Sequence, residues 1–182
     1  MIVDHNREKL LNTVIYFLEN TSWYGITKLF KLLYFLDFEH YKQTGRSVTG
    51  QDYFAWRMGP VPAKLREEID NPEEDFLTKL DVDIQSTKKG KTIYLKPKSN
   101  FDSTHFTRRE LRLLKEIATQ YAMNNSTEMV EYTHLDTQPW HQVWEVEKRC
   151  FDKIPYEYSL INEEKKLIKS IVIERLEMIN NY

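Results

Sequence analysis

The pattern of apolar and polar positions predicts a long helix at residues 26–42. No Gly or Pro interrupts this run, and at about 1.5 Å per residue it makes a helix roughly 25 Å long. Apolar side chains cover almost the whole helical wheel, and one narrow polar stripe is formed by Lys28, Lys31, Glu39 and Lys42. We therefore expect a central helix that is packed on most sides and has this stripe as its polar face.

Asp37 and His40 interrupt the apolar part of this helix. Both fall inside the arc of Leu29, Leu33 and Leu36 rather than on the lysine stripe. A buried carboxylate is costly unless it is hydrogen-bonded, so Asp37 needs a partner: His40, a backbone amide or a residue of the following loop. Two interpretations remain open, a polar pin that fixes the packing and a directly functional pair.

Helical spacing and capping signals predict the remaining helices. Thr107 and Glu110 form a capping box, and Pro62 and Pro139 suit the first turn of a helix. The predicted segments are a first helix from a cap at Asp4 or Asn6 to Glu19, and helices at 63–69, from 107 to about 121, 127–133, from 139 toward 148 and 163–179. The last helix has an apolar stripe and is expected to pack on the domain or on a partner.

Alternating residues predict one β-hairpin at about 80–96. The alternating runs 80–85 and 92–96 flank the polar, basic tip 86–91. Together with the helices, this hairpin indicates an α+β fold that is predominantly α-helical. At 182 residues the chain is expected to form a single domain, 1–182, with a substantial core.

The segment 53–62 predicts a rigid, aromatic-rich elbow. Gly59-Pro60 disfavours helix, and Pro62 precedes the next helix. Aromatic and arginine residues beside a proline-stiffened turn are typical of binding surfaces, although Phe54 and Trp56 also suit a core. The candidate partner-binding residues are Tyr53, Trp56, Arg57, Lys64 and Arg66.

Two ordered signatures in this chain resemble the Panacea domain family, which includes SocA-like antitoxins and phage-associated GepA-type proteins. The first signature comprises 27–29, 31–35, Asp37, His40, Gly45, 49–50 and 59–62, and the second comprises 126–134 and 138–140. About ninety residues separate the two signatures, so the pair is more specific than either alone. The resemblance covers most of the chain from Gly25 to about Trp144.

The resemblance implies an antitoxin that binds and neutralises a toxin encoded by the adjacent gene. It also implies that the motif residues keep the structural or functional places that they have in the family. These residues are Lys31, Asp37, His40, Gly59, Pro60, Val61, His134, Pro139 and Trp140. DNA-binding segments in the family are separate additions, and none is visible here.

Charge and motif content weigh against the alternative functions. The net charge of −2 provides no global field for nucleic acid, and the central helix is too apolar for the recognition helix of a winged-helix DNA-binding or adaptor protein. A hydrolytic enzyme using Asp37, His40 and His134 is a further alternative. However, the chain has no glycine-rich phosphate loop and no nucleophile motif, so we expect no enzymatic activity.

The histidine, cysteine and hydropathy patterns bear on metal binding and on the cellular compartment. His134 and His141 have no third ligand at zinc spacing, and Cys150 is the one cysteine, so we expect no metal and no cofactor. The sequence has no apolar run long enough to cross a bilayer, and charged residues occupy the N-terminal region where a signal peptide needs its apolar core. These features predict a cytoplasmic protein.

Overall fold

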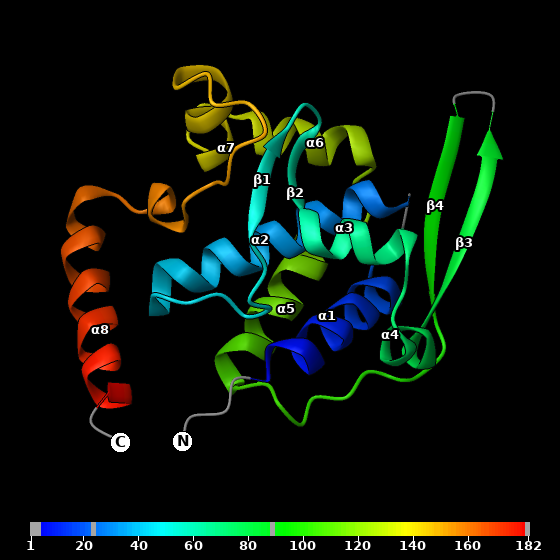
Figure 1. Ribbon diagram of the computed structural model, residues 1–182, viewed down its shortest axis with the longest axis horizontal. Helices are drawn as coiled ribbons and strands as arrows, with labels where there is room; N and C mark the ends of the chain where they lie inside the picture. Colours follow the sequence, from blue (N-terminus) through cyan, green and yellow to red (C-terminus); the bar gives the residue numbers. More distant parts are fainter. Residues whose placement is uncertain (1–4, 23–24, 88–89, 181–182) are drawn as a thin grey trace.

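A computed structural model describes residues 5–22, 25–87 and 90–180 of the chain (Figure 1). Helices predominate over two small antiparallel sheets, which confirms the predicted α+β class. The helices are α1 (Asn6–Asn20), α2 (Ile26–Thr44), α3 (Ala63–Asp70), α4 (Glu74–Lys79), α5 (Arg108–Gln120), α6 (Ser126–His134), α7 (Pro139–His141) and α8 (Asn162–Asn180), with the short helices η1 (Gln142–Val146) and η2 (Tyr156–Ser159). The strands are β1 (Tyr53–Trp56), β2 (Gly59–Pro62), β3 (Leu80–Thr87) and β4 (Gly90–Pro97).

The central position predicted for 26–42 is confirmed. α2 contacts α1, α5, α6, α8 and strands β2 and β4, and it crosses the middle of the molecule in Figure 1. Leu32, Leu33 and Leu36 lie wholly inside the core. The helix ends at Gly45, which adopts the left-handed conformation with φ of 71° and donates its amide to Tyr41, as glycine readily does after a helix.

The expected polar stripe of α2 is wrong at its N-terminal half. Lys28 and Lys31 are each 1% exposed, because their long side chains reach backbone carbonyls of neighbouring segments. Lys28 Nζ donates to Ser22 O at 2.7 Å, and Lys31 Nζ donates to a carbonyl of β2. A helical wheel shows that lysine is polar, but it does not show whether the folded chain provides a hydrogen-bond acceptor that allows the lysine to be buried.

The 53–62 elbow is an antiparallel hairpin, which the sequence did not predict. β1 and β2 pair from Tyr53 with Pro62 to Trp56 with Gly59, so Arg57 and Met58 form the tip. Four-residue strands carrying two prolines give little strand signal. The predicted hairpin at 80–96 is confirmed, since β3 and β4 pair from Leu80 with Pro97 onward.

Capping boxes start both α5 and α6, and the one in α5 was predicted. Thr107 and Glu110 form the expected capping box, and Asn125 forms a second one with Glu128. In α1, His5 occupies the cap position and Asn6 is already helical, while Asp4 lies outside the described residues.

The helix expected from Pro139 toward Lys148 is not continuous. Only α7 is α-helical, and η1 is wound as a π-helix. The chain then turns back so that residues 151–154 lie beside β1, with Phe54 and Lys153 forming a β-bridge.

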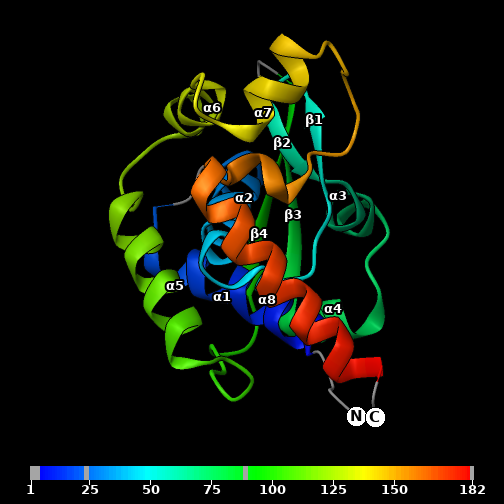
Figure 2. The same cartoon turned by 90° about the vertical axis from the view of Figure 1, so that its left-hand side faces the viewer.

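α8 packs against the end of α2 at one side of the molecule (Figure 2). Ile168 is buried, whereas Leu167 and Leu176 are exposed. The predicted apolar stripe is thus only partly covered by the rest of the chain. Among the described residues, no helix has both the length and the apolar character that spanning a membrane requires.

Candidate functional site

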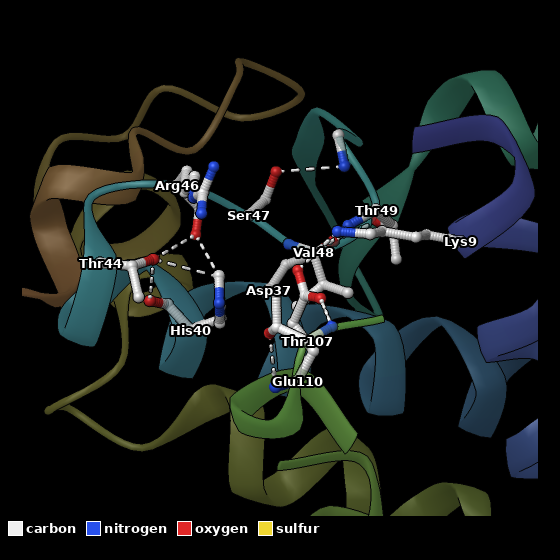
Figure 3. Close-up of polar contacts among 11 residues, drawn as sticks. Lys9, Asp37, His40, Thr44, Arg46, Ser47, Val48, Thr49, Thr107 and Glu110 are labelled. Atoms are coloured by element: carbon white, nitrogen blue, oxygen red, sulfur yellow. Dashed lines mark hydrogen bonds and ion pairs between the residues drawn. The ribbon is translucent and has the colours of Figure 1, made fainter. Parts of the chain in front are cut away.

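Asp37 anchors the loop that follows α2 (Figure 3). Its side chain is 0% exposed. Oδ1 accepts the amides of Val48 and Thr49, each at 2.8 Å. Oδ2 accepts the hydroxyls of Thr49 and Tyr53, the latter at 2.7 Å. The carboxylate therefore joins the middle of α2 to residues 48–49 and to the first residue of β1.

Burial raises the pKa of Asp37 to about 6, although the hydrogen bonds from Thr49, Tyr53 and Val48 oppose this shift. The pKa of Tyr53 is also raised, first by burial and then by the nearby Asp37. Each carboxylate oxygen already has two protein donors. A general base must reach a substrate proton, so this arrangement fits a structural pin better than a catalytic group.

His40 holds the same loop through a separate contact. Its Nδ1 lies 2.7 Å from Arg46 O and 3.2 Å from Thr44 Oγ1, and burial lowers its pKa. Within the described residues no hydrogen bond joins His40 to Asp37. The two side chains are neighbouring anchors of one loop.

Lys31 forms a second buried centre beneath the β1–β2 hairpin. Its Nζ donates to Pro60 O at 2.8 Å, and burial lowers its pKa to about 7. Gly59, with φ of 95°, packs so closely that an added Cβ would lie 2.7 Å from Thr133 Oγ1 and 2.8 Å from Lys31 Cε. Lys31, the Gly59-Pro60 backbone and α6 therefore meet at one crowded point.

The second signature supplies the other side of this centre. Trp140 is buried and donates from Nε1 to Trp56 O at 2.8 Å. His134 stacks on Trp140 with 3.8 Å between ring centroids. Trp144 also stacks on Trp140, with 5.6 Å between ring centroids. Burial, then the charge of Lys31, lowers the pKa of His134. The two signatures thus converge on the β1–β2 hairpin.

The described part of the chain contains one group of three acidic side chains close enough to share a cation, namely Glu68, Glu73 and Asp75. The guanidinium of Arg7 already fills this place. It donates to Glu68 and to both oxygens of Asp75, and its hydrogen bond lowers the pKa of Asp75. His134 and His141 do not belong to this group.

The candidate partner-binding residues do not share one surface. Tyr53 is 0% exposed and bonds to Asp37, so its assignment to an accessible surface is wrong. Lys64 lines a cavity of about 530 Å³ between α1 and α3. Trp56 and Arg66 instead line a cavity of about 160 Å³, where Arg66 pairs with Asp70 at 2.6 Å.

Sequence reasoning missed two side chains beside the hairpin tip. Met58 lines the smaller cavity and is exposed, and Phe151 is exposed where residues 151–154 meet β1. Met58 had a local signal, because it follows Arg57 directly before the Gly59-Pro60 turn. Phe151 had none, because only the tertiary fold brings it to β1.

A comparison with protein families supports the resemblance of both signatures. The family model described as "Antitoxin SocA-like, Panacea domain" matches residues 29–141, a span that includes most of α2, the β1–β2 hairpin, α6 and Trp140. Searches of curated proteins and of solved structures gave no match. Because the matched span is more than half of the 182 residues, the chain belongs to the SocA-like antitoxin family that carries the Panacea domain.

Proposed function

We propose that this protein is an antitoxin that neutralises a cognate toxin, encoded by the adjacent gene, through direct protein–protein contact. The observation that carries the proposal is the exposed tip of the β1–β2 hairpin. Residues of both family signatures, Lys31 and Trp140, bond to the backbone of this hairpin. Trp56, Arg57 and Met58 project at this tip. Aromatic, arginine and methionine side chains are enriched in protein interfaces.

The hairpin tip is held rigidly on both sides. Trp56 O accepts the indole N–H of Trp140, and Pro60 O accepts the ammonium group of Lys31. A surface that is already ordered loses little conformational entropy when a partner binds. This pre-organisation supports recognition by contact rather than by folding on binding.

Two alternative functions have weaker support. Asp37 and His40 are both engaged with the 44–49 loop, which leaves no group of a hydrolytic site free at that place. A winged-helix protein inserts an exposed helix into a DNA groove, whereas α2 is enclosed by other elements. The proposed action therefore involves no turnover, no cofactor and no metal.

The proposed encounter takes place in the cytoplasm. The described residues contain one free cysteine, Cys150, which is exposed. An unpaired exposed thiol suits a reducing compartment, where disulfides rarely persist.

Co-expression with the protein encoded next to this gene tests the proposal. The wild-type chain should restore growth and co-purify with that protein. Arg57→Ala and Arg66→Ala, each checked for folding by circular dichroism, should reduce both readouts together. Growth rescue without a complex would refute direct binding, and complexes of unchanged affinity with both folded variants would place the interface away from the hairpin.

A further inference from the structure

A β-bulge places Phe151 beside the hairpin tip. The amide of Phe151 donates to Ala55 O at 2.8 Å, and the amide of Ala55 donates to Asp152 O at 2.9 Å. Phe151 and Asp152 together therefore oppose the single residue Ala55. The first bulge residue, Phe151, has φ of 67°, which is the geometry of the bulge type that normally has glycine at this position.

Phenylalanine is a costly choice at this position. The left-handed conformation crowds its Cβ against the backbone, and the side chain is 63% exposed, so burial offsets little of the strain. Lys148, three residues earlier, is the other described non-glycine residue with positive φ, at 56°. The π-helix η1 ends at Val146, two residues before Lys148. Unusual backbone of this kind concentrates at functional sites.

Phe151 extends the surface of the hairpin tip. Its ring meets Trp144 edge-on with 5.5 Å between centroids, and its backbone pairs with Ala55, the residue before Trp56. Trp56 and Met58 in turn line the cavity of about 160 Å³. The backbone pairing therefore places Phe151 opposite the residue that precedes Trp56, and Trp56 in turn borders this cavity.

Most cationic side chains around this surface are already engaged, and Lys31, which lines the cavity, donates to Pro60 O. Arg66 pairs with Asp70, Lys148 with Glu145, and Arg149 with Glu147 and Asp152. Arg57, exposed at the hairpin tip, forms no ion pair within the described ranges. A ligand that brings a carboxylate to the tip would complement this charge.

We propose that Phe151, Trp56 and Met58 form the docking surface for one apolar side chain of the toxin, with an acidic toxin residue beside it that pairs with Arg57. The proposal rests on the antitoxin function proposed above and specifies the chemistry of the partner. The cavity of about 160 Å³ has room for one side chain of roughly benzene size, and its lining includes Lys31 and Arg66 beside the apolar Trp56, Met58 and Val61. Glycine would adopt the positive φ of this bulge with less strain. We therefore attribute the phenylalanine at this position to contact with the partner.

The test separates binding from folding. Affinity for the purified adjacent-gene protein and the thermal unfolding midpoint are measured for wild type, Phe151→Gly and Phe151→Asn, because glycine and asparagine both accept positive φ. We expect both variants to weaken binding about tenfold or more, as loss of an aromatic anchor does, with an unchanged or higher midpoint. Met123→Ser removes an exposed apolar side chain elsewhere and should bind as wild type does.

The contrary outcomes are distinct. Unchanged affinity in folded Phe151→Gly and Phe151→Asn would overturn the docking surface while the antitoxin function stands. A large fall in the midpoint of both variants would also overturn it, because Phe151 would then be a packing residue. Arg57→Glu should weaken binding more than Arg57→Lys, and equal affinities would refute the acidic partner residue. A wild-type chain that neither binds nor rescues would refute the proposed function, and this inference with it.

Discussion

Lys31 Nζ lies 2.8 Å from Pro60 O, so the N-terminal half of the central helix is bonded directly to the second strand of the exposed hairpin. Lys31 is 1% exposed, and its hydrogen bond to Pro60 O is buried beneath the hairpin. Pro60 has no amide to offer, but its carbonyl remains a full acceptor. The buried lysine thereby couples core packing to the geometry of the proposed binding surface.

Stability should depend on pH through Lys31. Its pKa in the folded state is lowered from 10.5 to about 7 by burial, so protonation disfavours the folded state between these values. The folded state therefore has its full stability above pH 10.5, where Lys31 is neutral in both states, and loses stability as the pH falls toward 7. Relative to Lys31→Met, the wild type should gain about 2 kcal/mol in free energy of unfolding from pH 7 to pH 9. Urea unfolding at both pH values measures this, and parallel pH profiles would contradict the buried position of the amine.

Asp37 should have the opposite pH dependence. Its folded-state pKa is raised from 3.8 to about 6, so its contribution is fully present below pH 3.8 and is lost as pH rises through 6. Asp37→Asn has no charge to bury, and between pH 4 and pH 7 it should gain about 2–3 kcal/mol relative to wild type. Denaturant midpoints of both proteins across this range provide the measurement, and a constant difference would show that Asp37 titrates normally.

Removal of the Asp37 side chain should damage the fold. Asp37→Ala leaves the buried donors of Val48, Thr49 and Tyr53 without their acceptor, which should cost at least about 2 kcal/mol. Asp37→Asn keeps an acceptor for the two amides and is the matched control at pH 7. If Asp37→Ala were as stable as wild type but failed to neutralise the toxin, the structural interpretation would give way to a functional one.

Gly59 should be more sensitive to substitution than Gly90. Both have positive φ, 95° and 119°, but an added Cβ meets Thr133 and Lys31 at Gly59 and nothing within 4 Å at Gly90. Gly90→Ala therefore reports backbone strain alone, of order 1 kcal/mol, and Gly59→Ala adds crowding of about 1–3 kcal/mol. Thermal or urea unfolding of the two variants measures the difference. Equal losses would mean that the close approach at Gly59 is not enforced.

The core position of α2 can be checked with a single truncation. Leu33 is fully buried at the centre of the helix, so Leu33→Ala removes buried methyl groups and leaves a cavity, at a cost of roughly 2–5 kcal/mol. Leu176→Ala, on the exposed side of α8, should change stability by less than about 1 kcal/mol. A shared denaturant midpoint for Leu33→Ala and wild type would refute the central-helix assignment.

Local and periodic signals were sufficient for much of the fold. The apolar run 26–42, the Thr107–Glu110 capping box and the alternating strands of the 80–96 hairpin each depend on neighbours within a few residues, and each was recovered. Asp37 was recognised as buried because it lies on the apolar arc of α2. Such features are readable from sequence, since helix and strand periods fix which residues share a face.

Contacts between distant segments were not accessible in the same way. The burial of Lys31 depends on a carbonyl twenty-nine residues away, the hairpin 53–62 depends on pairing around prolines, and Phe151 reaches β1 only through a π-helix and a bulge. The sequence therefore established the central helix, the 80–96 hairpin and the buried carboxylate. The fold in three dimensions established which polar groups are enclosed and which aromatic residues are exposed, because a side chain's exposure depends on what the rest of the chain packs against it.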